Sequence, residues 1–291
     1  MENFNKYLTE LKLSENTINK YVLKLKDFTD WIEQKNIDLE YLSYTDLLLY
    51  ISHLQRKGIS RQYQNQLIGI VRHYLDFKVK IGQMKANPAK QLFIRGVQRR
   101  IPHNLLTNKQ LNDIYENYHV KTNLQKRNKI ILGLLVYQAL TIQDLTNLKT
   151  EHLRLKEGKI YIPETPKTNS RILSLEAHQI YDLMEYTTST RSHLLNETEK
   201  QSDFLLFSSG SGNKLNNSLL KLFSTLKKTN SELKNASQIR ASVIANKLKS
   251  NDLRQVQYFA GHKWVSSTER YLMDDIEGLQ KSIDKFHPIK S

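Results

Sequence analysis

The segment from Asn235 to Tyr271 contains two short apolar stripes, and a glycine and a histidine directly follow the second one. The first stripe repeats at helical spacing and consists of Ala236, Ile239, Val243, Ile244 and Leu248. The second stripe consists of Leu253, Val256, Phe259 and Ala260. Apolar residues three or four positions apart lie on one face of a helix, and a glycine commonly follows a helix end. The segment therefore predicts two helices with a turn at Gly261, with Arg240 near the start of the first helix and His262 directly after the second.

Three chemically different groups lie in this segment: the guanidinium of Arg240, the imidazole of His262 and the phenol of Tyr271. A phenol attacks phosphorus when its surroundings stabilise the charge that develops. An arginine fork and a histidine donor are suited to stabilising charge on phosphate oxygens. This combination suggests covalent phosphoryl transfer.

The same segment resembles the tyrosine recombinase (phage integrase) family. In that family the motif runs His-x-x-Arg, then Leu-Gly-His, then Tyr after a similar gap, and Arg240, Gly261-His262 and Tyr271 follow this pattern. The letters SSTERYL resemble the family's segment around its nucleophile, and Ser237 stands at the position of the first histidine. The resemblance implies that Tyr271 cleaves DNA through a 3′-phosphotyrosyl link. Arg240 and His262 would stabilise charge on the non-bridging oxygens, without a metal, ATP or another cofactor.

A second motif of the family is similar to residues 139–144. The family has Gly-Leu-Arg before a helix that carries an acidic residue, and this chain has Ala139-Leu140-Thr141 followed by Asp144. Threonine has neither the charge nor the bidentate fork of arginine. Thr141 therefore replaces the family's first catalytic arginine by a neutral side chain. Three basic residues nearby in sequence are candidates for a replacement cation: Lys149, Arg154 and Arg171.

Residues 160–162 and 172–174 have the composition of two short strands, and the letters PKTNS between them predict a hairpin turn. Lys167 lies in this turn. From its residue type alone, a lysine in a turn is a solvated surface residue. The resemblance implies instead that Lys167 reaches the minor groove and protonates the leaving 5′ oxygen.

Helical patterning over the whole chain predicts a mainly α fold with a small β-hairpin or sheet. We expect an N-terminal bundle of about four helices over residues 1–82, a basic linker over 83–106 and a mixed α/β catalytic domain over 107–291. The resemblance identifies the bundle with the family's SAM-like core-binding domain. A last helix is predicted from Ile276, Leu279, Ile283 and Phe286, which share one face.

The expected linker has a strongly basic composition. It contains no acidic residue and carries Lys85, Lys90, Arg95, Arg99 and Arg100. Such a run is either a solvated loop or a strap that neutralises the phosphates of a DNA backbone.

The composition favours a polyanionic partner. Lys and Arg total 44 against 29 Asp and Glu, which gives a formal charge of +15 and suggests a nucleic acid. The family resemblance implies that this nucleic acid is double-stranded DNA. The chain has no cysteine, so thiolate chemistry is excluded, and its nine histidines show no paired metal-ligand spacing. The N-terminus lacks a signal core and the longest apolar run is too short to span a bilayer. We expect a soluble cytoplasmic protein without a membrane segment.

Three functions fit these observations. The first, implied by the resemblance, is a site-specific DNA recombinase or integrase that acts as a homo-tetramer on paired sites. The second is a catalytically weakened or inactive DNA-binding accessory protein on the same fold, which Thr141 and Ser237 favour. The third is a basic helical RNA-binding protein, for which the chain shows no aromatic-basic RNA-reading motif.

Overall fold

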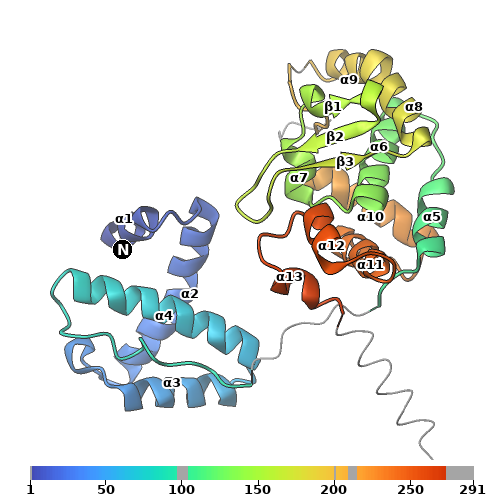
Figure 1. Ribbon diagram of the computed structural model, residues 1–291. Helices are drawn as coiled ribbons and strands as arrows, with labels where there is room; N and C mark the ends of the chain where they lie inside the picture. The colour runs from blue at the N-terminus through green and yellow to red at the C-terminus, as the bar shows by residue number, and fades with distance from the viewer. Residues whose placement is uncertain (1, 97–103, 200, 209–214, 273–291) are drawn as a thin grey trace, which may run out of the picture. The chain divides into compact units, whose positions relative to one another are not determined.

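The structure is a computed structural model that describes residues 2–96, 104–199, 201–208 and 215–272 (Figure 1). The chain divides into two compact units, Met1–Arg99 and Arg100–Ser291, each with its own hydrophobic core. The division lies inside the linker that the sequence predicts.

The first unit is a helical bundle made of α1 (Glu2–Glu10), α2 (Glu15–Gln34), α3 (Tyr44–Arg56) and α4 (Arg61–Lys80), with a short turn, η1 (Leu39–Tyr41), before α3. Serines begin three of these helices. The hydroxyl groups of Ser14, Ser43 and Ser60 each accept a hydrogen bond from a backbone N–H in the first turn. Such caps satisfy donors that have no partner within the helix.

The core of the first unit lies where α1, α2, α3 and α4 meet. Its fully buried side chains include Leu8, Leu25, Phe28, Leu47, Ile68 and Leu75. Part of the expected linker also belongs to this core, because Met84, Ala89 and Leu92 are buried in it. The guanidinium of Arg72 on α4 fixes this segment by donating to the carbonyl oxygens of Ala89 at 3.0 Å and Leu92 at 2.7 Å.

The second unit begins with α5 (Asn108–Glu116), α6 (Asn123–Gln138) and α7 (Ile142–Asn147). Turns η2 (Thr150–His152) and η3 (Leu155–Glu157) flank strand β1 (Leu153–Arg154), and strands β2 (Lys159–Ile162) and β3 (Arg171–Ser174) follow. After the strands come α8 (Ala177–Glu185), a π-helical turn η4 (Tyr186–Thr190), α9 (Arg191–Glu197) and α10 (Asn216–Thr229). The described part ends with α11 (Ala236–Leu248), α12 (Leu253–Ala260) and α13 (Ser266–Glu269).

The three strands form an antiparallel sheet in the order β1-β2-β3. Ile160 pairs with Leu173 and Ile162 pairs with Arg171, so the β2–β3 connection is the predicted hairpin. Ile160 and Ile162 are fully buried, which places one face of the sheet against the core.

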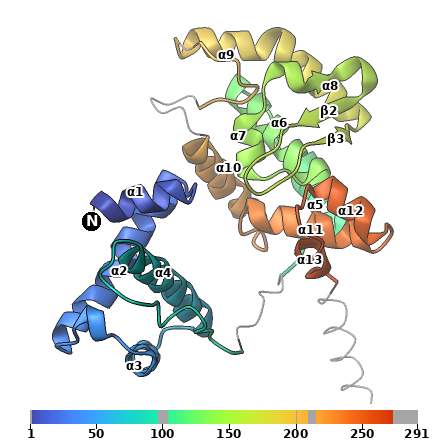
Figure 2. The ribbon, with the colours of Figure 1, turned by 60° about the vertical axis from the view of Figure 1, so that its left-hand side comes forward.

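Helix α6 runs through the middle of the second unit and contacts α5, α8, α9 and α11 (Figures 1 and 2). Ile131, Leu132, Leu134 and Leu135 on this helix are fully buried. A helix that is apolar nearly all round is expected at such a central position. The fold confirms the prediction of a mainly helical chain with a small sheet.

The predicted last helix, with Ile276, Leu279, Ile283 and Phe286, lies outside the described residues. Among the residues that are described, no helix is both long and apolar enough to cross a membrane.

Candidate active site

Arg240 lies on the second turn of α11, which Asn235 caps by accepting from the backbone N–H of Gln238 at 3.0 Å. Its guanidinium donates to the carbonyl oxygen of Ala139 and, at 2.7 Å, to that of Ala260. These two carbonyls mark the C-terminal ends of α6 and α12, where the partial negative charge of a helix favours a cation. Arg240 therefore holds together the ends of two helices.

The charge of Arg240 is retained at neutral pH. Burial lowers the pKa of its guanidinium to about 10, and the positive charge of Arg171 acts in the same direction. Asp144 and Tyr271 oppose this shift. A pKa near 10 still leaves a full positive charge at pH 7, now in a poorly solvated place where it acts more strongly on a neighbouring anion.

Gly261 ends α12 in the left-handed conformation, with φ of 68°. A β carbon at this position would lie only 2.6 Å from Nη1 of the buried Arg171, so a larger residue meets both a backbone and a steric penalty. The glycine carbonyl accepts a hydrogen bond from the backbone N–H of Asn169 at 2.8 Å. The turn that presents His262 is thus attached to the loop between β2 and β3.

His262 is buried and neutral at physiological pH. Burial lowers the pKa of its imidazole to about 3, with further lowering by the positive charges of Arg240, Arg270 and Arg171. Its Nδ1 lies 2.8 Å from the hydroxyl oxygen of Thr268. When the hydroxyl donates to Nδ1, the proton of the neutral ring is on Nε2, which is then a hydrogen-bond donor.

Tyr271 follows α13 and lies against His262. The two rings are nearly parallel, with centroids 6.2 Å apart and 6° between their planes. The phenol oxygen accepts a hydrogen bond from Nη2 of Arg270 at 2.9 Å, and the Arg270 guanidinium carbon lies 4.9 Å from the Tyr271 ring centroid. The structure therefore brings the phenol, the imidazole and two guanidinium groups into one cluster.

Lys167 is exposed in the β2–β3 loop, where its backbone N–H donates to the hydroxyl oxygen of Thr165 at 3.2 Å. The next residue, Thr168, forms an antiparallel bridge with His262. The loop that carries Lys167 is consequently joined to the His262 turn through adjacent backbone contacts.

Thr141 has a structural role at the position of the family's first arginine. It caps α7, because its hydroxyl oxygen accepts from the N–H of Asp144 at 3.0 Å and its own N–H donates to the Asp144 carboxylate at 2.9 Å. The same carboxylate accepts from Arg171 at 3.0 Å, in an ion pair with no exposed surface on either side chain. Arg171 also donates to the carbonyl oxygens of Phe259 and Asn169.

Of the three candidates for a replacement cation, only Arg171 lies in the cluster, and its donors are committed to these partners. Lys149 lies 3.8 Å from the carboxylate of Glu151, and Arg154 is exposed on β1. Ser237 lies on the exposed side of the first turn of α11. Arg270 was not among the sequence candidates, because its place directly before the tyrosine in SSTERYL does not by itself distinguish it from a solvated surface arginine.

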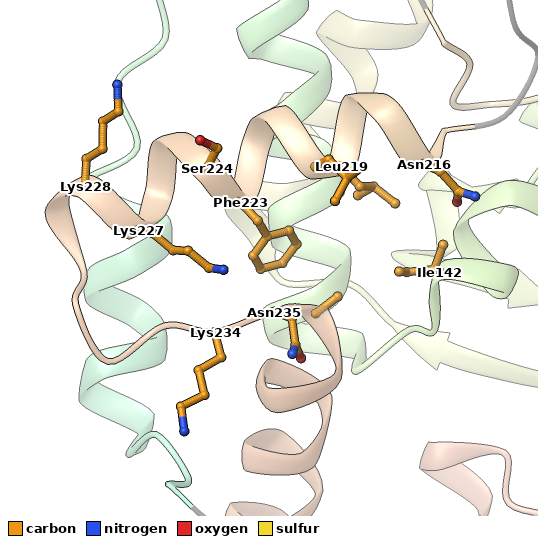
Figure 3. Close-up of a pocket in the computed structure, with 11 residues that line it drawn as sticks. Ile142, Asn216, Leu219, Phe223, Ser224, Lys227, Lys228, Lys234 and Asn235 are labelled. Carbon is orange, nitrogen blue, oxygen red and sulfur yellow. The ribbon is translucent and has the colours of Figure 1, made fainter.

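A separate cavity of about 980 Å³ lies between α10 and the start of α11 (Figure 3). Leu219, Leu220 and Phe223 give it apolar walls, and Lys227, Lys228 and Lys234 line it as well. None of the predicted catalytic residues lines this cavity. Its lysines nevertheless add a basic surface to the same unit.

Comparisons with known proteins give consistent results. Residues 104–277 match the phage integrase family, and residues 1–82 match the phage integrase N-terminal SAM-like domain. Tyrosine recombinase XerD of Haemophilus influenzae is 25% identical over 290 residues, which cover 98% of this chain and 96% of that one. Tyrosine recombinase XerC of Bacillus pumilus is also 25% identical, over 98% of this chain and 95% of its own.

Two solved structures have the same fold. One is the XerH site-specific recombinase bound to palindromic difH substrate in a post-cleavage complex, with a TM-score of 0.73, 18% identity and coverage of 91% of this chain and 78% of that one. The other is the Tn1549 transposon integrase in complex with a circular intermediate DNA, with a TM-score of 0.64, 13% identity and coverage of 92% and 94%.

Proposed function

Because this chain belongs to the phage integrase family, we propose that it is a tyrosine-type site-specific recombinase, which cuts and rejoins duplex DNA through a 3′-phosphotyrosyl intermediate. The cluster of Tyr271, His262 and Arg240 is the observation that carries this proposal. A binding protein has no chemical use for a phenol stacked on a neutral imidazole beside a desolvated cation. The similarity to the tyrosine recombinases XerD and XerC supports the same activity.

In the proposed reaction, the phenol oxygen of Tyr271 forms a bond to the scissile phosphorus and the bond from phosphorus to the 5′ oxygen breaks. The phenol proton passes to solvent, and Lys167 gives a proton to the leaving 5′ oxygen. In the resealing step a 5′ hydroxyl from the second duplex attacks the phosphotyrosyl ester and gives its proton to Lys167. The bond from phosphorus to the Tyr271 oxygen breaks, which restores the phosphodiester, and the phenol takes up a proton from solvent. The energy of the broken bond is kept in the covalent link, so the resealing step uses no external energy source.

Arg240 and His262 act on the charge that develops on the non-bridging oxygens. The Arg240 guanidinium is desolvated and its pKa, about 10, keeps it positive at pH 7. His262 contributes through a neutral N–H, since its pKa of about 3 excludes an imidazolium at that pH. Donors of this kind are effective because they are fixed before the reaction begins.

Duplex DNA is the proposed partner, and two features of the chain support it. The formal charge is +15, and the cavity beside α10 is lined by Lys227, Lys228 and Lys234. Exchange between two duplexes breaks four strands, and each chain supplies one Tyr271. We therefore propose a homo-tetramer on paired sites.

The second candidate is a DNA-binding accessory protein with weakened catalysis. Thr141 and Ser237 favour it, since removing one preorganised donor costs about 2.7–4 kcal/mol of transition-state stabilisation. A covalent-capture assay separates the two functions. The full chain is incubated with a pool of nicked duplexes that are randomised around the nick, so that cleavage releases a short fragment and traps the protein on DNA.

A recombinase gives adducts that survive denaturing detergent, and sequencing the trapped duplexes defines a preferred substrate. An accessory protein shifts duplex DNA in a native gel and gives no trapped product. The second result, obtained with protein that binds duplex DNA, would refute the enzymatic proposal.

A further inference from the structure

The neutral residue at Thr141 leaves the proposed reaction short of one cation at the phosphate. Its hydroxyl oxygen and its N–H are both engaged with Asp144 at the start of α7. The phosphate gains charge on its non-bridging oxygens during attack, and Arg240 provides one guanidinium for it. A second positive group near Tyr271 would restore what Thr141 lacks.

Arg171 does not meet this need, although its charge is close by. Its side chain is fully buried, and its guanidinium donates to the carboxylate of Asp144 and to two carbonyl oxygens. Turning it toward a phosphate would leave the buried Asp144 carboxylate without its counter-charge, which is strongly destabilising. Arg171 therefore affects the site indirectly, through the electrostatic effect of its charge on Arg240 and His262 and through its packing against Gly261.

Arg270 has the required position and freedom. Nη2 of this arginine lies 2.9 Å from the phenol oxygen of Tyr271, which is the atom that attacks phosphorus. Its side chain is exposed, and its guanidinium also lies over the face of the Tyr271 ring. Its positive charge also lowers the pKa values of His262 and Arg240, which places it within electrostatic reach of both groups.

We propose that Arg270 is a catalytic residue that supplies the cation missing at Thr141, by donating to a non-bridging oxygen of the scissile phosphate as Tyr271 attacks. This inference rests on the proposed recombinase function. Once the phenol oxygen is bonded to phosphorus, the non-bridging oxygens are attached to the same atom. A donor already within hydrogen-bond distance of the phenol oxygen reaches them by a small side-chain rotation. Arg270 transfers no proton, so the balance of the reaction is unchanged.

Changing the charge of the scissile phosphate distinguishes a catalytic role of Arg270 from a structural one, because a structural defect would slow the reaction equally on charged and neutral substrates. Replacing one non-bridging oxygen by a methyl group gives a neutral methylphosphonate, which develops less negative charge and has less need of the cation. The rate of adduct formation is measured for the full-length wild type and for Arg270→Ala. The substrate is a nicked duplex whose sequence was selected in the covalent-capture assay, with either a phosphate or a methylphosphonate at the scissile position. Arg270→Gln keeps a donor without the charge and is measured in parallel.

On the phosphate duplex, we expect Arg270→Ala and Arg270→Gln to form adducts about 10²–10³-fold more slowly than the wild type. On the methylphosphonate duplex, both variants should approach the wild-type rate. Arg254→Ala removes an exposed arginine at the start of α12 and controls for overall charge, and its rate should follow the wild type on both duplexes.

Two results would overturn the inference while leaving the recombinase function intact: Arg270→Ala reacting as fast as the wild type on phosphate, or an equal defect on both duplexes. A wild type that forms no adduct on either duplex would refute the proposed function, and the role of Arg270 with it.

Discussion

The ring of Tyr271 lies parallel to the ring of His262, with centroids 6.2 Å apart and 6° between the planes. Both residues are buried, since Tyr271 retains 5% and His262 retains 8% of its full solvent exposure. The proposed nucleophile is therefore held against a neutral imidazole before DNA arrives.

We predict that His262 does not titrate between pH 8 and pH 5 in the folded protein, because burial lowers its pKa to about 3. An NMR titration of the imidazole protons tests this, with His262→Gln identifying the resonance. The chemical shift of that resonance should stay constant over this pH range.

The same shift has a consequence for stability. The unfolded chain takes up a proton at His262 below about pH 6.5 and the folded chain does not, so acid favours unfolding by about 1.4 kcal/mol per pH unit until the folded pKa is approached. The wild type should lose stability faster than His262→Gln as the pH falls from 6.5 to 4. Parallel losses, together with an imidazole that titrates near pH 6.5, would show that His262 is solvated.

Replacing Gly261 with alanine should disrupt the His262 turn. The new β carbon would lie 2.6 Å from Nη1 of Arg171, and the backbone has φ of 68°. Gly58 is a matched control, since it follows α3 with φ of 70° and has open space around its α carbon. Gly58→Ala should cost about 1–2 kcal/mol of backbone strain.

We expect Gly261→Ala to unfold at a lower denaturant concentration than the wild type and to lose adduct formation as well. Gly58→Ala should retain adduct formation. Equal rates of adduct formation for Gly261→Ala and Gly58→Ala would show that the close approach of Gly261 to Arg171 is not needed for DNA cleavage.

Lys167 is predicted to protonate the leaving 5′ oxygen. Lys167→Ala should therefore form adducts slowly, by about 10²–10⁴-fold, which is the usual contribution of a general acid. A 5′ bridging sulfur leaves readily without a proton, and a duplex with this substitution should restore the rate of Lys167→Ala. His262→Gln should not be restored by the same duplex, because its proposed partner is a non-bridging oxygen. A Lys167→Ala defect that the sulfur leaves unchanged would contradict the proposed role.

The lysines beside α10 are predicted to contact DNA phosphates. Lys227 and Lys228 are exposed in the last turn of this helix, and removing each phosphate contact reduces the dependence of log K on log salt by about 0.9. In the double variant Lys227→Ala/Lys228→Ala, the slope of log K against log salt for duplex binding should become shallower by up to about 1.8, which is twice the contribution of one phosphate contact. Lys126→Ala/Lys159→Ala removes the same charge from lysines that pair with Glu185 and Glu157, and it should keep the wild-type slope. Identical slopes for the two double variants would place the DNA contacts elsewhere.

The parts of the site that the sequence predicts are local ones. Arg240, His262 and Tyr271 lie in one segment of two helices and a glycine turn, so periodicity and a short motif are enough to propose them. The pair of Arg171 and Asp144 comes from β3 and α7 and forms only through tertiary packing. No sequence pattern specifies that contact.

Two further features illustrate the same limit. Arg270 looks like an ordinary charged residue in the sequence, and its significance comes from a side-chain conformation that places Nη2 on the phenol. Met84, Ala89 and Leu92 lie in a basic stretch whose charge suggests a linker, yet these apolar side chains pack into the first core. Charge density indicates where solvent or DNA contacts the chain, and it does not reveal which apolar residues between the charges are buried.

The most direct test of the account is the identity of the residue that becomes joined to DNA. Trapped wild-type adducts are digested and the DNA-linked peptide is identified by mass spectrometry, in parallel with Tyr271→Phe and with Tyr258→Phe, which removes an exposed phenol from α12. We predict that the wild type and Tyr258→Phe carry the 3′-phosphate on Tyr271 and that Tyr271→Phe forms no adduct. A covalent adduct that persists in Tyr271→Phe, or a linked peptide without residue 271, would contradict the central claim.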